Sequence, residues 1–113
     1  LTPARRDALV EALHRVGDRT FAVPGDDETD RLLARLASAL SAPGAAERFW
    51  RQHISRRGRT VEALHGRALA LSMLGRPDEA HSCIAQALPL ADPQERANLQ
   101  QWAAALSAWT EGL

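Results

Sequence analysis

The sequence predicts an all-α fold, and three observations lead to this prediction. Alanine, the residue with the highest helix propensity, makes up 22 of the 113 positions. The residues that favour strands are few, and tyrosine is absent. Apolar residues recur at spacings of three, four and seven between short segments that contain glycine or proline. We therefore expect about six helices, with consecutive helices packed antiparallel as hairpins because their connections are short.

The first three helices are placed by the residues that begin and end them. Thr2 and Pro3 are typical of the N-cap and first position of a helix, which we expect to end near Gly17. Residues 21–25 form a connector with a Pro-Gly turn, and the acidic residues at 26–30 favour the start of a second helix. Pro43 and Gly44 end that helix, and a third is expected over about 45–56. The side chains predicted to face inward are Leu9, Leu13 and Val16, then Leu33, Leu36, Ala37 and Leu40, then Phe49, Trp50 and Ile54.

Three more helices are expected in the second half of the chain. Thr60 predicts the N-cap of a helix over about 61–74, which Gly75 ends. Pro77, followed by two acidic residues, begins a fifth helix, and Asp92-Pro93 begins the sixth in the same way. The inward-facing side chains are predicted to be Leu64, Ala68, Leu71 and Leu74, then Ala80, Ile84, Ala87 and Leu88, then Leu99, Trp102, Ala103 and Leu106.

Charge and composition argue against several classes of function. The 14 basic residues, all arginine, balance 14 acidic residues, so no overall field attracts nucleic acid or a membrane surface. No run of about 18 apolar residues predicts a membrane span. The single cysteine, Cys83, excludes an internal disulfide and suits a reducing compartment, so we expect a cytoplasmic location. The chain begins with Leu1 and shows no signal peptide, and we expect residues 1–113 to be one domain from a longer chain.

Residues 61–94 carry a specific helix-turn-helix pattern. Counted from Val61, large apolar residues occupy positions 4, 11 and 24, alanines occupy positions 8, 20 and 27, and glycine occupies position 15. The alanines allow two helices to approach closely, while leucine and isoleucine fill the remaining gaps. This segment resembles the tetratricopeptide repeat family, which is built from helical hairpins of about 34 residues. The resemblance implies a short right-handed superhelix of hairpins, and a helical bundle without repeats is the alternative.

The flanking segments fit the pattern less well. Counts from Arg96 and from Asp30 make the last helix and the second helix the first helices of further repeats. Phe49 then falls where the pattern needs a small residue. Because Phe49 and Trp50 are both bulky, we expect wider spacing or a different crossing angle at the third helix.

The resemblance also implies a concave groove, in which members of the family hold peptides or helices. The groove positions are Glu62, His65, Leu69, Ser72 and Met73 in the fourth helix, Ala97, Gln100, Ala104, Ser107 and Ala108 in the last, and Arg31, Ala34, Ser38, Ser41 and Ala42 in the second. They lack the basic and amide cluster with which some members grip a carboxylate, so we expect a shallow groove for an apolar or helical segment. An ordinary surface on a short bundle is the alternative.

A second candidate site is a cluster of arginines. Its members are Arg48, Arg51, Arg56, Arg57 and Arg59. Such a cluster can bind phosphates or an acidic partner, and Trp50 is the aromatic residue within it that could stack on a base. In a net-neutral domain, however, the arginines are more often paired with nearby acids such as Glu47 and the 26–30 run. Nucleic-acid binding is therefore the less favoured hypothesis.

The sequence predicts no catalytic, cofactor or metal site. His81 and Cys83 are the one closely spaced pair of metal-ligand residues, and an i, i+2 pair on a helix diverges by about 200°. No nucleophile motif, phosphate-binding glycine loop or close carboxylate pair is present. We therefore expect isolated histidines and a buried thiol rather than ligands.

The expected function is a non-catalytic module for protein–protein interaction, acting as an adaptor, scaffold or chaperone for a peptide or helix. The alternative is an accessory or regulatory domain of a larger enzyme or regulator. Trp109, near the end of the last helix, either packs on the fifth helix or forms an exposed end. An exposed Trp109 would dock a partner, a second copy or the rest of a longer chain.

Overall fold

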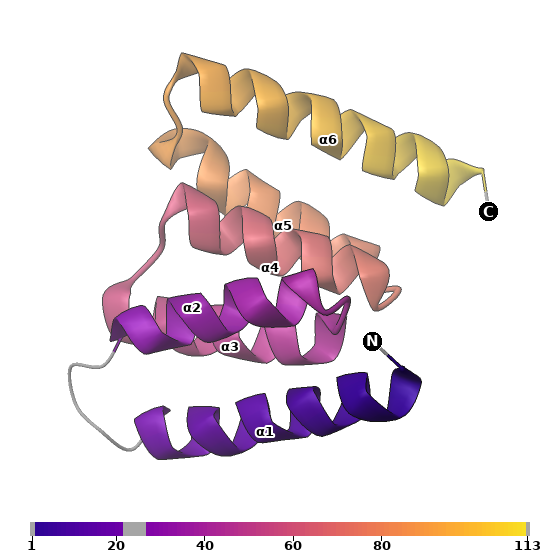
Figure 1. Ribbon diagram of the computed structural model, residues 1–113. Coiled ribbons are helices and arrows are strands. Elements are labelled where there is room, and N and C mark those ends of the chain that lie inside the picture. Colours follow the sequence, from indigo (N-terminus) through magenta and orange to yellow (C-terminus); the bar gives the residue numbers. More distant parts are fainter. Residues whose placement is uncertain (1, 22–26, 113) are drawn as a thin grey trace.

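The computed structural model describes residues 2–21 and 27–112, and the elements in these residues are all helical (Figure 1). The all-α prediction with about six helices is confirmed. Successive helices alternate in direction, so that α2, α4 and α6 run one way and α1, α3 and α5 the other. The elements are α1 Pro3–Phe21, α2 Asp27–Ala39, α3 Pro43–Arg57, α4 Val61–Met73, α5 Pro77–Ala87, the short 3₁₀ helix η1 Leu88–Leu90, and α6 Pro93–Glu111.

Capping residues fix the start of the later helices. The Thr60 hydroxyl accepts a hydrogen bond from the Ala63 backbone N–H at 3.2 Å, as expected for the N-cap of α4. At the start of α6 the Asp92 carboxylate accepts from the Glu95 backbone N–H, and the Glu95 carboxylate accepts from the Asp92 N–H. This reciprocal capping box satisfies two backbone donors that the first turn leaves unpaired. Gly75 ends α4 with a positive φ of 75°, which glycine adopts without strain.

Two predicted helix boundaries are wrong for the same reason, which is that glycine and proline have uses other than stopping a helix. Gly17 lies inside α1, which continues to Phe21. Pro43 does not end α2, because α2 ends at Ala39 and Pro43 is the first residue of α3. The predicted Pro-Gly connector falls largely on residues 22–26, which lie outside the described residues.

The large side chains of α3 are accommodated by glycines on the neighbouring helices. A Cβ at Gly17 of α1 would overlap the ring of Phe49, and a Cβ at Gly66 of α4 would overlap the indole of Trp50. Phe49 and Trp50 are both buried. The missing side chains on α1 and α4 therefore make room for the two rings at close range. The wider spacing or different crossing angle expected at α3 stays a prediction.

The core consists of two apolar clusters. The first joins α1 to α4 around Phe49 and Trp50, and the second joins α4, α5 and α6 around Leu64, Leu71 and Ile84. Most of the predicted inward positions belong to these clusters, with Leu13, Leu40, Ile54, Leu88, Trp102 and Ala103 partly buried.

Four predicted inward positions are exposed instead. These are Leu9 and Val16 of α1, Leu36 of α2 and Leu74 at the end of α4. In α1 the residues packed against the first cluster are Val10 and Leu13, so its buried face is turned by about one residue from the predicted stripe. Within residues 2–21 and 27–112, none of the helices combines the length and apolar character that a bilayer crossing requires.

Candidate functional site

Three segments that carry no charged residue come together at one end of the structure. They are residues 36–46, 68–75 and 97–110, which include the last turn of α2, about half of α4 at its C-terminal end and most of α6. An average content of 25% would place about eight charged residues in these 33 positions. Because α2, α4 and α6 run in the same direction, their C-terminal halves lie at the same end (Figure 1). We call the surface of these segments the charge-free face.

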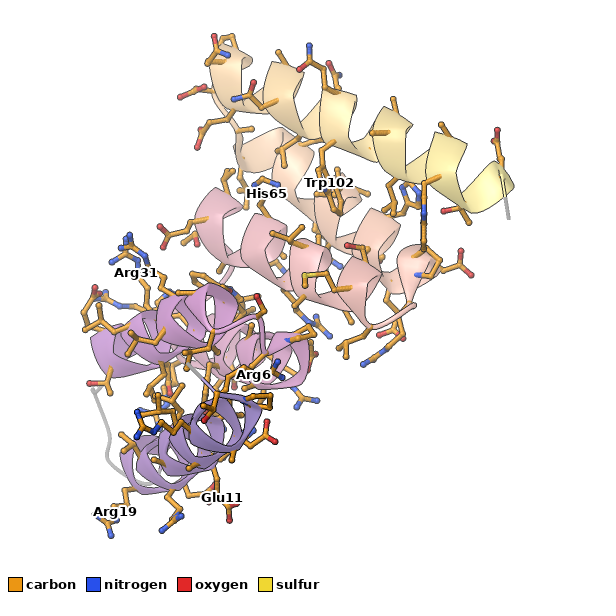
Figure 2. All side chains as sticks on the ribbon, turned by 45° about the vertical axis from the view of Figure 1, so that its right-hand side comes forward. Arg6, Glu11, Arg19, Arg31, His65 and Trp102 are labelled. Atoms are coloured by element: carbon orange, nitrogen blue, oxygen red, sulfur yellow. The ribbon has the colours of Figure 1, made fainter. Side chains whose placement is uncertain are left out.

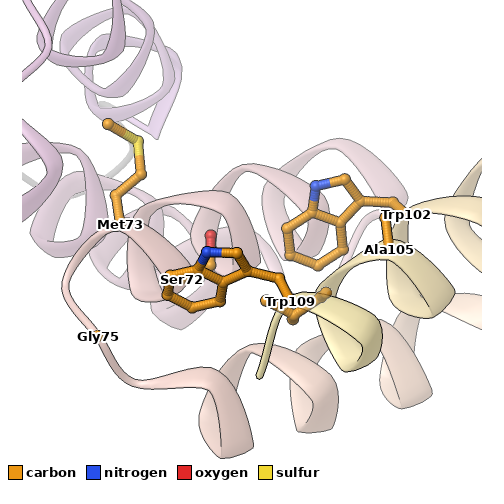
Figure 3. A pocket seen from close by; sticks show the side chains of 7 residues that line it. Ser72, Met73, Gly75, Trp102, Ala105 and Trp109 are labelled. Carbon is orange, nitrogen blue, oxygen red and sulfur yellow. The ribbon is translucent and has the colours of Figure 1, made fainter. Parts of the chain in front are cut away.

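An open pocket of about 460 Å³ lies within the charge-free face, between α4 and α6 (Figure 3). None of its lining residues is charged. They are Ser72, Met73, Gly75, Trp102, Ala105, Leu106 and Trp109. Met73 and Trp109 are 58% and 53% exposed, so a large apolar area at the pocket is in contact with water.

A second, smaller hollow of about 60 Å³ lies on the other side of Met73, between α4 and the α2–α3 turn. Ser38, Ser41 and Ala42 line it from α2 and the turn, and Leu69 and Met73 line it from α4. Met73 therefore borders both hollows, and the charge-free face continues across all three parallel helices.

The predicted groove residues are distributed over this face unevenly. Leu69, Ser72 and Met73 of α4 line the two hollows, as do Ser38, Ser41 and Ala42. Gln100 and Ala104 are exposed but do not line the α4–α6 pocket. Helix α6 buries Leu99 and Leu106, and this orientation brings Trp102, Ala105 and Trp109 to the pocket instead. The signal that could have found them is the uncharged run of α6 with two tryptophans seven residues apart.

Two further predicted groove residues, Glu62 and His65, lie toward the N-terminal end of α4. The guanidinium of Arg31 on α2 donates to both carboxylate oxygens of Glu62, and this lowers the pKa of the Glu62 carboxyl. The His65 ring meets the Trp102 ring of α6 nearly edge to face, with 5.7 Å between centroids. Burial lowers the pKa of the His65 imidazole, since the charged form loses water there.

A charged pocket of about 490 Å³ occupies this N-terminal end. Its lining residues are Glu28, Arg31, His53, Arg57, Thr60 and Glu62. Charges of both signs line it, and Arg31 is already bound to Glu28 and Glu62. The two ends of α2 and α4 therefore differ. Charged residues line a pocket at their N-terminal ends, whereas uncharged residues line the hollows near their C-terminal ends.

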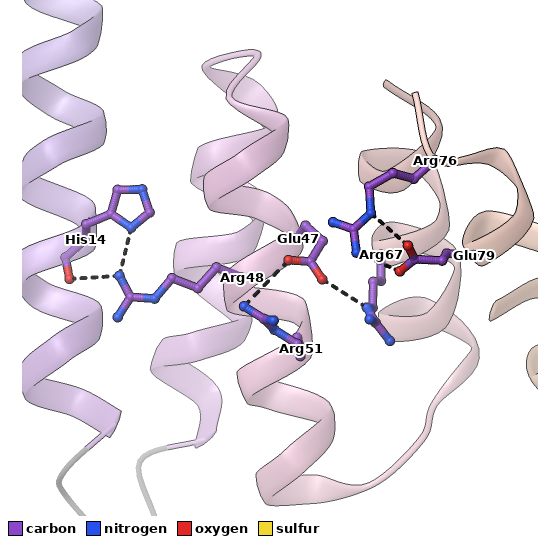
Figure 4. Close-up of polar contacts among 7 residues, drawn as sticks. All are labelled: His14, Glu47, Arg48, Arg51, Arg67, Arg76 and Glu79. Carbon is purple, nitrogen blue, oxygen red and sulfur yellow. Dashed lines mark hydrogen bonds and ion pairs between the residues drawn. The ribbon is translucent and has the colours of Figure 1, made fainter. Parts of the chain in front are cut away.

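The arginine cluster does not form one free cationic surface. Arg48 turns to α1, where it pairs with Asp18 and donates to the Nδ1 of His14 at 2.7 Å. Arg51 pairs with Glu47 of its own helix (Figure 4). Arg56 pairs with the buried Asp30 of α2, with 3.2 Å between Nε and Oδ2. The expected pairing with Glu47 is confirmed for Arg51, and the expected pairing with the 26–30 acidic run is confirmed for Arg56. Arg48 pairs instead with an acid of α1, and Arg57 and Arg59 lie exposed at the end of α3.

The prediction that Cys83 is a buried thiol is confirmed. Burial raises the pKa of this thiol, so its reactive thiolate form is disfavoured. His81, two residues earlier, faces α6 and lies 3.3 Å from the Ser107 hydroxyl through Nε2. In the described part of the chain, no three His, Cys, Asp or Glu side chains gather closely enough to hold a metal ion. No protein-family model, curated protein or solved structure matches the chain.

Proposed function

We propose that this chain is a non-catalytic module that binds an apolar, helical segment of a partner protein on the charge-free face. The observation that carries the proposal is the α4–α6 pocket, which exposes Met73 and Trp109 among uncharged neighbours. Tryptophan, tyrosine and methionine are enriched at the buried centres of protein interfaces. An apolar side chain that enters the pocket would remove these two residues from water without leaving any charge unpaired.

The shape of the charge-free face supports a helix as the ligand. Two hollows lie on either side of Met73, and a helix presents apolar side chains at i and i+3 or i+4 to such a row. We also propose that the chain is a tetratricopeptide-like array, with α2, α4 and α6 as the groove-forming helices. The α4–α5 hairpin supports this, since Ala68, Ala80 and Ala87 are all buried at its close contacts.

The test is a selection from a displayed library of helical peptides, followed by calorimetric titration of the best-bound peptide. We expect enrichment of uncharged peptides with large apolar residues on one face. Met73→Glu and Trp109→Glu should each weaken binding at least about tenfold, because each places a charge in the interface. Leu90→Glu is the matched control, since Leu90 is 52% exposed but lies in η1, away from the pocket.

Two results would overturn the proposal. One is a peptide that binds Met73→Glu and Trp109→Glu as tightly as it binds the wild type. The other is a wild-type chain that sediments as a dimer and becomes a monomer with Trp109→Glu, because the occupant would then be a second copy.

A further inference from the structure

Helix α6 is attached to the other helices in a different way from α1 to α4. Ion pairs link α1 to α3, α2 to both α3 and α4, and α3 to α4. They are Arg48–Asp18, Arg56–Asp30, Arg31–Glu62 and Arg67–Glu47. Among the described residues, no ion pair links α6 to another helix. Its apolar contacts include the buried side chains of Leu99 and Leu106, which belong to the second cluster.

In the described part of the chain, the two directional contacts that α6 makes with its neighbours both involve histidine. His65 of α4 lies against the Trp102 ring, as Figure 2 shows. His81 of α5 exchanges a hydrogen bond with Ser107 at 3.3 Å between Nε2 and Oγ. Imidazole is the side chain that changes its charge near neutral pH, so the attachment of α6 contains titratable groups at its contact points.

We propose that protonation of His65 loosens α6 from α4, so that the α4–α6 pocket is present near neutral pH and is weakened in mild acid. The pocket depends on this contact because Trp102 touches His65 and also lines the pocket wall. The loosening itself is independent of any ligand. Its effect on binding rests on the proposed function.

Among the residues that the structure describes, no carboxylate is placed to form an ion pair with a protonated His65. Helix α6 has no charged residue at positions 97–110. The segment 80–91, which begins in α5, also has none, and its titratable groups are His81 and Cys83. On α4, Glu62 lies one turn before His65 and is bound by Arg31 of α2. Arg67 of α4 is itself a cation, paired with Glu47 of α3. His53 of α3 and Arg35 of α2 lie near Glu62 and add no negative charge.

The sign of the effect follows from the burial of His65. A proton binds more weakly to the imidazole in the docked helix, where its pKa is lowered, than in the undocked helix, where it returns to about 6.5. Docking is therefore at full strength above pH 6.5. It weakens as the pH falls below 6.5, by up to about tenfold per pH unit, until the lowered pKa is reached.

His81 provides the matched control. The Ser107 hydroxyl can rotate, so it donates to an unprotonated Nε2 and accepts from a protonated one. The hydrogen bond therefore survives protonation, and the His81→Gln variant should keep the pH response. His65→Gln removes the titratable group but keeps a polar side chain, and it should abolish that response.

The experiment measures hydrogen exchange of α6 amides and the NMR titration of each histidine between pH 7.5 and 5, with exchange rates corrected for pH. We expect protection in α6 to fall below pH 6.5 in the wild type and in His81→Gln, while α3 and α4 stay protected. In His65→Gln, α6 protection should be independent of pH. Equal pH dependence in His65→Gln, or a measured pKa of His65 above 6.5, would overturn the proposal. The second result would mean that the Trp102 ring attracts the imidazolium.

These readouts need no ligand, so they separate this inference from the proposed function. If α6 loosens in acid but the selected peptide binds equally at pH 7.5 and 5.5, the link between docking and the binding site is wrong. If the peptide fails to bind at either pH, the proposed function is wrong and the loosening still stands.

Discussion

Helices α2, α3 and α4 and helix α6 are held in place by different chemistry. The first three are joined by ion pairs between neighbouring helices, including the buried Asp30 with Arg56 and the buried Glu47 with Arg67. Helix α6 is held by Leu99 and Leu106 and by two histidine contacts. Charged pairs with defined geometry fix the relative position of two helices. Apolar contacts are less directional, so two helices joined by them can slide past each other at a lower cost in free energy. We therefore regard α2, α3 and α4 as a fixed scaffold and α6 as an adjustable wall of the candidate site.

The two kinds of attachment also respond to pH in different ranges. Carboxylates lose their charge near or below pH 4, whereas imidazole gains its charge near pH 6.5. Between about pH 5 and 6 an ordinary carboxyl group keeps its charge, whereas proton binding to His65 already opposes the docking of α6. A pH in this interval should affect the wall and leave the scaffold intact.

The largest expected effect is on the scaffold. Asp30→Ala should lower the free energy of unfolding by about 3–5 kcal/mol, because it leaves the largely buried Arg56 without its carboxylate. Denaturant unfolding followed by circular dichroism measures the loss. Replacing both partners by apolar residues, in Asp30→Leu with Arg56→Met, should recover most of it. A loss below about 1 kcal/mol for Asp30→Ala would show that this pair does not hold α2 on α3.

A smaller and more local effect is expected in the wall. Leu106→Ala removes a buried side chain that packs α6 on α4 and α5, and should cost about 2–3 kcal/mol. Hydrogen exchange should show the loss in α6, with the amides of α2 and α3 retaining their protection. If protection falls equally in all helices, α6 unfolds only with the rest of the chain and the proposed separation between scaffold and wall is wrong.

The smallest effect concerns the exposed link between α2 and α4. Glu62→Gln removes the charge that Arg31 binds, and the pair is solvent-accessible, so little stability is lost at moderate salt. Because Arg31 lowers the Glu62 pKa, the contribution is present above pH 4.5 and disappears as the pH falls through the lowered pKa. Thermal unfolding of wild type and variant should therefore differ slightly at pH 7 and coincide near pH 2. A difference that persists at pH 2 would mean that packing rather than charge joins these residues.

Much of the fold could be predicted from the sequence because it depends on local signals. Thr60, Asp92 and the prolines at 77 and 93 mark helix starts through their own backbone chemistry, and the structure confirms them. Gly17 and Gly66 could not be interpreted in this way, since their role depends on Phe49 and Trp50 reaching them from another helix. A single sequence does not contain that tertiary contact.

The candidate site was predicted best where the repeat pattern is strongest. Leu69, Ser72 and Met73 of α4 lie on the charge-free face because the α4–α5 hairpin fixes the orientation of α4. The prediction for α6 placed Gln100 and Ala104 in the groove, but the orientation of α6 depends on how Leu99 and Leu106 fit between α4 and α5. Repeat spacing defines which residues share a face, whereas packing decides which way that face turns.

The placement of the three tryptophans gives the molecule built-in optical reporters. Trp50 is buried over Gly66 between α3 and α4, Trp102 touches His65 between α4 and α6, and Trp109 is exposed at the pocket. Variants that keep one tryptophan and replace the other two by phenylalanine would therefore have distinct emission spectra. The Trp50 signal would follow the scaffold, the Trp102 signal would follow the wall and the charge of His65, and the Trp109 signal would shift to shorter wavelength when a ligand covers it.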